Sequence, residues 1–371
     1  MPQKPRTRRM TRTPRTTRLL LFFLVGVCSL AIGTAEASLG DRLPEFKECV
    51  QVCERENCDP NNDPTPIPLH LRLLLWSCAQ ECDYTCQHII TSRRLSSSPP
   101  RPVTQFHGKW PFVRFLGLQE PFSVLFSLGN LVVHYIGLRK IRERLPVLSN
   151  EAKDREQQQQ WPMRRFYICF AYIGIATWVL STVFHARDFK LTERLDYFGA
   201  GASVLYGLYY TVVRVFRLDD TPTSSPPLSF QPTQRRRTRQ KQSLLRIWTL
   251  LCASLYAAHV AYLTLWKWDY GYNMRANLVV GALHNALWTA LSWRRWRETR
   301  QAWTTWPGVF VAWVTLAMSL ELLDFPPLWG AIDAHSLWHA GTIAPTVLWY
   351  NFMIRDSQDL ARSAKLKESK A

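Results

Sequence analysis

Two pairs of polar residues have a spacing that suits chemistry on a helix face. His335 and His339 stand four residues apart near the start of one apolar segment, and Ser181 and His185 stand four apart near the end of another. Residues at i and i+4 share a helix face, so each pair aims two side chains at one point. Neutral imidazole is a common zinc ligand, and polar groups within membrane segments usually mark a working site. The alternative is two histidines that are plain core residues.

Long apolar segments identify the chain as a membrane protein. Of its 371 residues 47% are hydrophobic, and they gather in seven runs. Each run is close to the ~20 residues that a helix needs to cross a bilayer. The predicted fold is an all-α, seven-transmembrane helix bundle preceded by a small disulfide-rich luminal domain. The predicted spans are residues 121–138, 166–184, 195–216, 244–266, 274–293, 306–323 and 335–354.

The N-terminus has the pattern of a secretory signal peptide. A basic stretch precedes the apolar run 19–32, and Ala35, Glu36 and Ala37 then form an A-x-A cleavage site. A signal anchor that remains as an additional helix is the alternative. The predicted division of the chain is a signal peptide (1–37), a cysteine-rich luminal domain (38–110), a transmembrane domain (111–356) and a cytosolic tail (357–371).

Six cysteines follow the predicted signal in two clusters. An even number of cysteines behind an export signal indicates a disulfide framework in an oxidising lumen. Zinc binding is the alternative, which the absence of C-x-x-C pairs disfavours. Six cysteines allow fifteen connectivities, and the number alone selects none of them. The cysteines are Cys49, Cys53, Cys58, Cys78, Cys82 and Cys86.

The strong positive charge follows the predicted membrane topology. The net charge is +18, but the basic residues cluster beside apolar segments and do not form one patch interleaved with aromatics, so nucleic acid is not an expected partner. If the cysteine-rich domain is luminal, the loops predicted to be cytosolic hold 24 Lys and Arg and the luminal loops hold 5. The positive-inside rule therefore agrees with the signal peptide, and the C-terminus is expected in the cytosol. Two polar loops, 151–160 and 219–242, are predicted to be unstructured.

This topology brings five polar residues to one side of the membrane. Ser181 and His185 end the second predicted span on its luminal side, Asp196 opens the third, and His335 and His339 open the seventh. Three imidazoles and a water make a catalytic zinc site with an open position. A nearby carboxylate can act as general base, and a hydroxyl can donate to a developing oxyanion.

The same five positions resemble the pattern of the CREST superfamily of seven-helix membrane hydrolases. More narrowly, the chain is similar to the post-GPI-attachment family, the phospholipases that remodel the lipid of GPI-anchored proteins. A cysteine-rich luminal domain behind a signal peptide is also a feature of that family. The matching stretches are FVRFLGLQEP (112–121), STVFHARD (181–188), RLDYF (194–198) and DYGYN (269–273).

The resemblance implies a zinc-dependent phospholipase A2-type enzyme that removes the sn-2 acyl chain from the inositol phospholipid of GPI-anchored proteins. It implies zinc held by His185, His335 and His339, Asp196 as the base and Ser181 as a donor to the oxyanion. The expected partners are GPI-anchored proteins with their phosphatidylinositol lipid. The expected location is the membrane of the endoplasmic reticulum, with the Golgi membrane as the alternative.

Two other functions stay open at this point. Alkaline ceramidases of the superfamily carry an acidic calcium-binding segment before their first helix, whereas residues 117–122 here contain only Glu120 as an acidic side chain. This departure argues against a ceramidase-type amide hydrolase and leaves calcium binding unsupported. The second alternative is a non-catalytic receptor or folding factor with structural zinc, although structural zinc is usually enclosed by four protein ligands.

Overall fold

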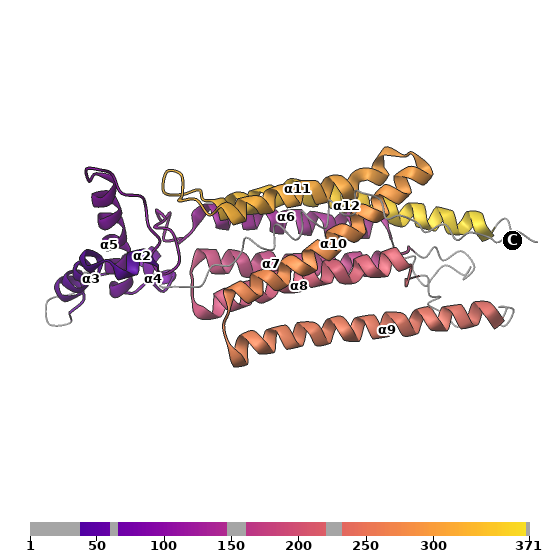
Figure 1. Ribbon diagram of the computed structural model, residues 1–371, viewed down its shortest axis with the longest axis horizontal. Helices are drawn as coiled ribbons and strands as arrows, with labels where there is room; N and C mark the ends of the chain where they lie inside the picture. The colour runs from indigo at the N-terminus through magenta and orange to yellow at the C-terminus, as the bar shows by residue number, and fades with distance from the viewer. Residues whose placement is uncertain (1–37, 60–65, 147–160, 220–231, 369–371) are drawn as a thin grey trace, which may run out of the picture.

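The molecule consists of a head of short helices and a bundle of long helices that lie side by side (Figure 1). The computed structural model describes residues 38–59, 66–146, 161–219 and 232–368. The predicted signal peptide and the polar loop 151–160 therefore lie outside the described residues.

The head is built on two helices that local sequence signals define. α3 begins with Pro44, whose fixed φ suits the first turn of a helix. α5 begins with a capping box, in which the backbone N–H of Gln80 donates to Ser77 Oγ and the backbone N–H of Ser77 donates to the Gln80 side chain. Phe46, Ile90 and Phe106 are buried in the small core of the head. Its helices are α2 (Leu39–Arg42), α3 (Pro44–Asn57), α4 (Leu69–Leu73) and α5 (Cys78–Leu95).

Three disulfides join α3 and the residue that follows it to α5. Cysteines four residues apart lie on one face of each helix, and the two rows pair in antiparallel order. The prediction of a disulfide-rich domain is thereby confirmed for the described residues. The bridges are Cys49–Cys86, Cys53–Cys82 and Cys58–Cys78.

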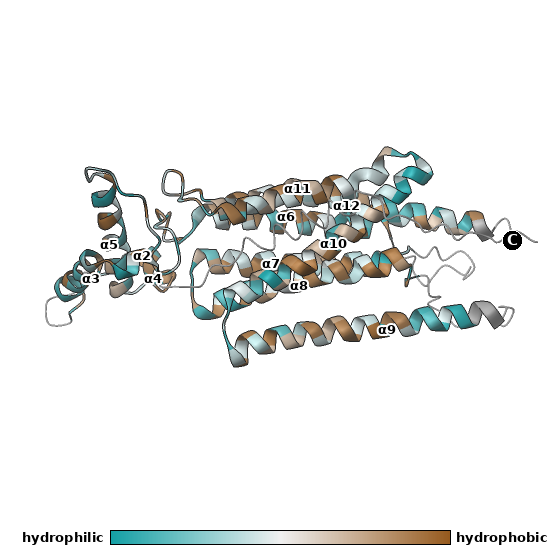
Figure 2. Ribbon diagram, viewed as in Figure 1, coloured by the Kyte–Doolittle hydropathy of each residue, from teal (hydrophilic) through white to brown (hydrophobic). Residues whose placement is uncertain are grey.

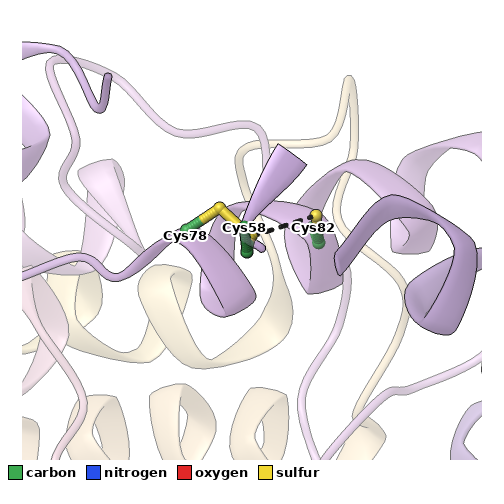
Figure 3. A group of neighbouring side chains, drawn as sticks. All are labelled: Cys58, Cys78 and Cys82. Atoms are coloured by element: carbon green, nitrogen blue, oxygen red, sulfur yellow. Dashed lines mark hydrogen bonds between the residues drawn. A yellow bond between two sulfur atoms is a disulfide. The ribbon is translucent and has the colours of Figure 1, made fainter. Parts of the chain in front are cut away.

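The sulfur atoms at one end of this ladder lie close together (Figure 3). The Sγ atoms of Cys58 and Cys82 are 3.9 Å apart, and Cys78 completes a group whose spacing would suit a metal ion. All three sulfurs are already bonded in disulfides, whereas a cysteine binds metal as a thiolate. The pairing therefore accounts for this cluster without zinc.

Removal of one bridge should weaken the head. The Cys49–Cys86 bridge closes the longest of the three loops, with a sequence separation of 37 residues. We expect the double substitution Cys49→Ser and Cys86→Ser to lower the unfolding free energy of the head by about 2–5 kcal/mol. Limited proteolysis of the full-length protein in urea measures this change. In the parent protein, thiol labelling after denaturation without reduction should miss all six cysteines, and labelling that appears only after chelation would instead indicate metal.

Seven long helices follow the head in the described part of the chain, and four segments are long and apolar enough to cross a membrane. Those segments are Pro121–Arg144, Arg164–Ala186, Arg236–Trp266 and Ala302–Leu323, and their apolar character is visible in Figure 2. α9 ends in the π-helical turn η3 (Tyr262–Trp266), and the 3-10 turn η4 (Ala302–Thr305) precedes α11. The helices are α6 (Pro121–Arg144), α7 (Arg164–Ala186), α8 (Lys190–Phe216), α9 (Pro232–Ala261), α10 (Tyr270–Thr299), α11 (Trp306–Leu323) and α12 (Ala334–Glu368).

Glycines let the helices that carry the predicted site approach closely. A Cβ at Gly174 of α7 would lie 2.1 Å from Nδ1 of His134 on α6, and a Cβ at Gly137 of α6 would lie 2.4 Å from the ring of Tyr350 on α12. Small residues at helix contacts are a general feature of membrane bundles, where close packing replaces the hydrophobic effect. The His134 ring also meets the Tyr350 hydroxyl at 2.8 Å, so this histidine joins α6 to α12.

A proline within α12 is compensated by its neighbour α11. Pro345 has no N–H to donate to the carbonyl of Gly341 four residues earlier. The indole N–H of Trp313 donates to that carbonyl at 3.0 Å. The carbonyl that Pro345 leaves without its helical donor is therefore satisfied.

A buried ionic cluster fastens the C-terminal half of α12 to the bundle. The Asp356 carboxylate is fully buried and accepts two hydrogen bonds from the Arg214 guanidinium, at 2.6 and 2.7 Å. Arg295 of α10 binds both Asp356 and Asp359, and the Tyr167 hydroxyl donates to Asp356 at 3.2 Å. α7, α8, α10 and α12 therefore meet at this cluster. Loss of one partner would leave a buried charge without compensation.

Two helices begin five or more residues before their predicted spans. α9 starts at Pro232, so the second half of the loop 219–242 is helical and its prediction as unstructured was wrong for residues 232–242. That prediction considered only whether the segment could bury a core, but a polar segment rich in Arg and Gln can extend a helix that is already formed. α8 starts at Lys190, five residues before the predicted span, because the backbone N–H of Phe189 donates to Thr192 Oγ1 and caps the first turn.

Candidate metal centre

Three histidines from two helices converge at the end of the bundle that faces the head. His185 ends α7, while His335 and His339 share a face in the first turns of α12. Their candidate ligand atoms all lie within 4.8 Å of one another, and the ring centroids of His335 and His339 are 4.5 Å apart. His185 and His339 are 2% and 4% exposed, so these two face the bundle interior, whereas His335 is half-buried.

Carboxylates fix the orientation of two of these imidazoles. His185 Nδ1 donates to Glu120 Oε2 at 2.7 Å, and His335 Nδ1 donates to Glu321 Oε2 at 2.6 Å. Each carboxylate thereby places the ring proton on Nδ1 and leaves Nε2 with a free lone pair, which is the usual arrangement behind a metal-binding histidine. Glu120 is the residue before α6 and Glu321 lies in the last turn of α11.

The Nε2 atoms of His185 and His335 face one another at 3.3 Å. With both ring protons on Nδ1, two lone pairs would meet at this distance, and that contact is repulsive unless a proton or a metal ion lies between them. Two nitrogens bound tetrahedrally to zinc at ~2.0–2.1 Å would stand about 3.3–3.4 Å apart. The donor set therefore fits zinc.

Hydroxyl groups surround the third imidazole. His339 Nδ1 lies 3.0 Å from Ser127 Oγ and 3.4 Å from the Ser123 carbonyl, so its proton also has acceptors and its Nε2 is free. Ser127 Oγ is in turn 3.1 Å from Ser181 Oγ. Ser181 is 3% exposed. The structure therefore places the predicted Ser181 beside the histidines through Ser127, one helix turn before His185.

Asp196 lies in α8, near enough to His185 and His335 for its carboxylate to interact with them electrostatically. It is the seventh residue of the helix, so it does not cap the first turn. In the described structure no side chain forms a hydrogen bond or ion pair with it, and Arg194 instead lies over the Trp268 ring. A half-buried carboxylate without a partner beside three imidazoles is available to a water or a substrate.

A lysine from the head completes the environment of His185. Lys109 Nζ binds Glu120 Oε1 at 2.6 Å and Asp188 Oδ2 at 2.9 Å. Burial by itself would raise the pKa of the Glu120 carboxyl. Lys109 and His185 outweigh this effect and hold the pKa of Glu120 well below its usual range. Glu120 is therefore a charged acceptor for the His185 ring. The site is thus tied to the segment that leads from the head into α6.

Glu120, Glu321 and Ser127 were not among the residues predicted to form the site. Glu321 had a usable signal, because an acidic residue within a predicted apolar span is costly and usually has a function. Glu120 was considered only as a possible calcium ligand. The Glu120 carboxylate instead forms an ion pair with the Lys109 ammonium group. That ammonium group balances the carboxylate charge that a divalent cation would otherwise balance.

Comparison with known proteins gives matches over nearly the whole chain. Residues 68–357 match the Per1-like family. The chain is 38% identical to the Protein PER1 homolog of Schizosaccharomyces pombe, covering 92% of this chain and 94% of that protein. It is 36% identical to the GPI-specific phospholipase A2-like PGAP3 of Bos taurus (95% and 98% covered) and 33% identical to that of Homo sapiens (94% and 97% covered). The chain therefore belongs to the Per1-like family.

Proposed function

We propose that this protein remodels GPI anchors by hydrolysing the sn-2 acyl ester of the inositol phospholipid on GPI-anchored proteins. The observation that carries the proposal is the convergence of three imidazoles, each with its Nδ1 satisfied, beside the unpartnered carboxylate of Asp196. The names of the relatives support the reaction class, because they describe a phospholipase A2-like activity specific for GPI. The proposed location is the membrane of the endoplasmic reticulum, with the Golgi as the alternative.

The proposed topology has seven spans, α6 to α12. Four candidate spans and three neighbouring helices packed among them support this number. The excess of basic residues in alternate loops supports a luminal head and a cytosolic C-terminus. The head (38–110) would then follow a cleaved signal peptide (1–37), and the domain 111–356 would hold the centre at its luminal face. Residues 357–368 continue α12 into the proposed cytosolic tail.

Each residue of the centre has a distinct part in the proposed mechanism. The histidines His185, His335 and His339 would hold zinc, which when bound lowers the pKa of a water towards ~7 and polarises the ester carbonyl. The Asp196 carboxylate accepts the proton of the attacking water and returns it to the glycerol oxygen as the ester C–O bond breaks. The Ser181 hydroxyl donates a hydrogen bond to the oxygen of the carbonyl as negative charge develops there.

The surrounding groups hold this arrangement in place. Glu120 and Glu321 keep the rings of His185 and His335 oriented through their Nδ1 protons. The edge of the His339 ring packs against Trp178, with ring centroids 5.2 Å apart, which limits the access of bulk water on that side. An ester at the glycerol backbone lies at the depth of the membrane face, while its acyl chain remains among the apolar helices.

Lipid mass spectrometry of GPI anchors tests the proposed reaction. In cells that lack the protein, the anchors should keep the acyl chain that a remodelled anchor has lost. Expression of the parent protein should restore remodelling, and expression of His339→Ala at the same level should not. Normal anchors in the deleted cells together with accumulated ceramide would contradict the proposal and favour the amide hydrolase.

A further inference from the structure

A cavity of about 310 Å³ lies between the head and the helix bundle. Its walls come from α5, from the segment 106–119 that leads into α6, and from residues 187–188 between α7 and α8. This volume equals that of roughly ten water molecules in the liquid, which is enough for a small polar ligand. The proposed reaction at the histidines does not itself use this space.

Two guanidinium groups meet on one indole at the wall of the cavity. The Arg114 guanidinium lies 3.3 Å from the ring centre of Trp76, and that of Arg187 lies 3.6 Å from the same ring. Arg114 also forms an ion pair with Glu81 and stacks on Tyr84 at 4.0 Å. Stacking on aromatic faces holds a guanidinium in a fixed plane, so less entropy is lost when it binds an anion.

Arg187 is a buried cation whose charge is not balanced by a bound carboxylate. It is 7% exposed, and it donates to the carbonyls of Leu74 and Asp188 and to the side-chain oxygen of Gln80. Within the described residues no carboxylate oxygen forms an ion pair with it. The guanidinium groups of Arg187 and Arg114 also stand close together over the Trp76 ring. An anion in the cavity would balance the charge of Arg187.

The cavity is one ion pair away from the histidine centre. Lys109 and Asp188 line the cavity, and Lys109 Nζ binds the Glu120 carboxylate that orients His185. Arg187, which also lines the cavity, is two residues beyond His185 in the sequence, so a ligand held at Arg187 lies near the centre.

We propose that this cavity binds the inositol phosphate headgroup of the lipid substrate. This assignment rests on the proposed function. It adds a site that would recognise the headgroup and so select an inositol phospholipid as the substrate. A phosphodiester suits the Arg187 guanidinium, because guanidinium and phosphate form charge-assisted paired hydrogen bonds. The polyol ring suits the remaining lining, in which Asp83 and Gln87 offer acceptors and Trp110 offers an apolar face.

Calorimetric titration of the full-length, zinc-loaded protein in detergent tests the assignment without turnover. The probe is glycerophosphoinositol, which has the headgroup and glycerol but no acyl ester to hydrolyse. We expect it to bind, and we expect inorganic phosphate and free myo-inositol to bind at least tenfold more weakly. Inorganic phosphate that binds as tightly as glycerophosphoinositol would overturn the proposal, because the cavity would then recognise an anion and not the inositol headgroup.

Two variants locate the binding within the cavity. Arg187→Gln removes the charge and should weaken glycerophosphoinositol binding by about 10- to 100-fold, as expected for the loss of a hydrogen bond to a charged group. Gln87→Trp fills the cavity from α5 and leaves the contacts of Arg187 with Leu74 and Gln80 in place, so it should weaken binding even if Arg187→Gln disturbs the fold. Arg93→Gln is the matched control, because it removes the same charge from an exposed position of α5 outside the cavity.

The outcomes separate this site from the reaction. Binding that is unchanged in both cavity variants, or no binding to the parent protein, would overturn the headgroup assignment. Headgroup binding in a protein that leaves GPI anchors unremodelled in cells would keep the cavity and remove the proposed reaction. Normal remodelling by a protein without measurable headgroup binding would keep the proposed reaction and remove the headgroup assignment. Zinc content, measured for each variant, shows that the bundle has folded.

Discussion

Protein purified with His335→Ala and His339→Ala together should contain no zinc and should have no hydrolytic activity. Only one imidazole, that of His185, would remain at the centre, and a single nitrogen does not hold zinc against solvent. Elemental analysis of the purified protein should show the metal content falling from about one zinc ion per chain to background, since a catalytic zinc site needs three protein ligands. Each single histidine substitution should also reduce the zinc content and the hydrolytic activity.

The control for this experiment is a histidine of the head. His70 is exposed in α4 and lies outside the centre, so His70→Ala should keep both zinc and activity. Membrane insertion of every variant is checked by its resistance to carbonate extraction. Stoichiometric zinc in the double variant would show that the ligands lie elsewhere.

Asp196→Asn should abolish most of the hydrolysis and leave the metal bound. Asparagine keeps the shape of the side chain but cannot accept a proton from water. Loss of a positioned general base costs about 10²–10⁴ in rate. Because Asp196 neither caps α8 nor forms an ion pair in the described structure, the substitution should cost little stability. The rate is measured as turnover of a GPI lipid by the purified protein, and the zinc content of the same protein is measured in parallel.

A second aspartate, at the start of α10, provides the matched control. Asp269 caps α10 by accepting a hydrogen bond from the backbone N–H of Tyr272, a function that asparagine can also perform. Asp269→Asn should therefore keep full activity. Unaltered turnover in Asp196→Asn would mean that its carboxylate has no part in proton transfer, and the mechanism would need another base.

Local patterns in the sequence predicted the polar residues of the centre but not the groups that orient them. The i, i+4 pairs gave four of the five predicted residues, because helix periodicity fixes which side chains share a face. Glu120 and Lys109 come together through the fold of the segment between head and bundle, and no periodic pattern encodes such a contact. The cavity at Arg187 arises in the same way, from packing between parts distant in the sequence.

The disulfide pairing shows what a closer use of periodicity could have added. Cys49 and Cys53 are four residues apart, as are Cys78, Cys82 and Cys86, so each set forms a row on one helix face. Two antiparallel helices pair such rows in reverse order, which selects one connectivity of the fifteen. The start of α9 could not be found in this way, because a charged helical extension of a span and a charged coil have similar composition.

α12 is fastened to the bundle at two points along its length. His339 belongs to the centre near its start, and Asp356 binds Arg214 near the other end. The two positions are 17 residues apart, which corresponds to about 26 Å of helix rise and so to most of the ~30 Å hydrocarbon thickness. A piston-like shift of α12 by one residue, about 1.5 Å, would break the ionic cluster and misalign the imidazoles together. α12 therefore acts as a strut of fixed length that couples the ionic cluster to the histidine centre.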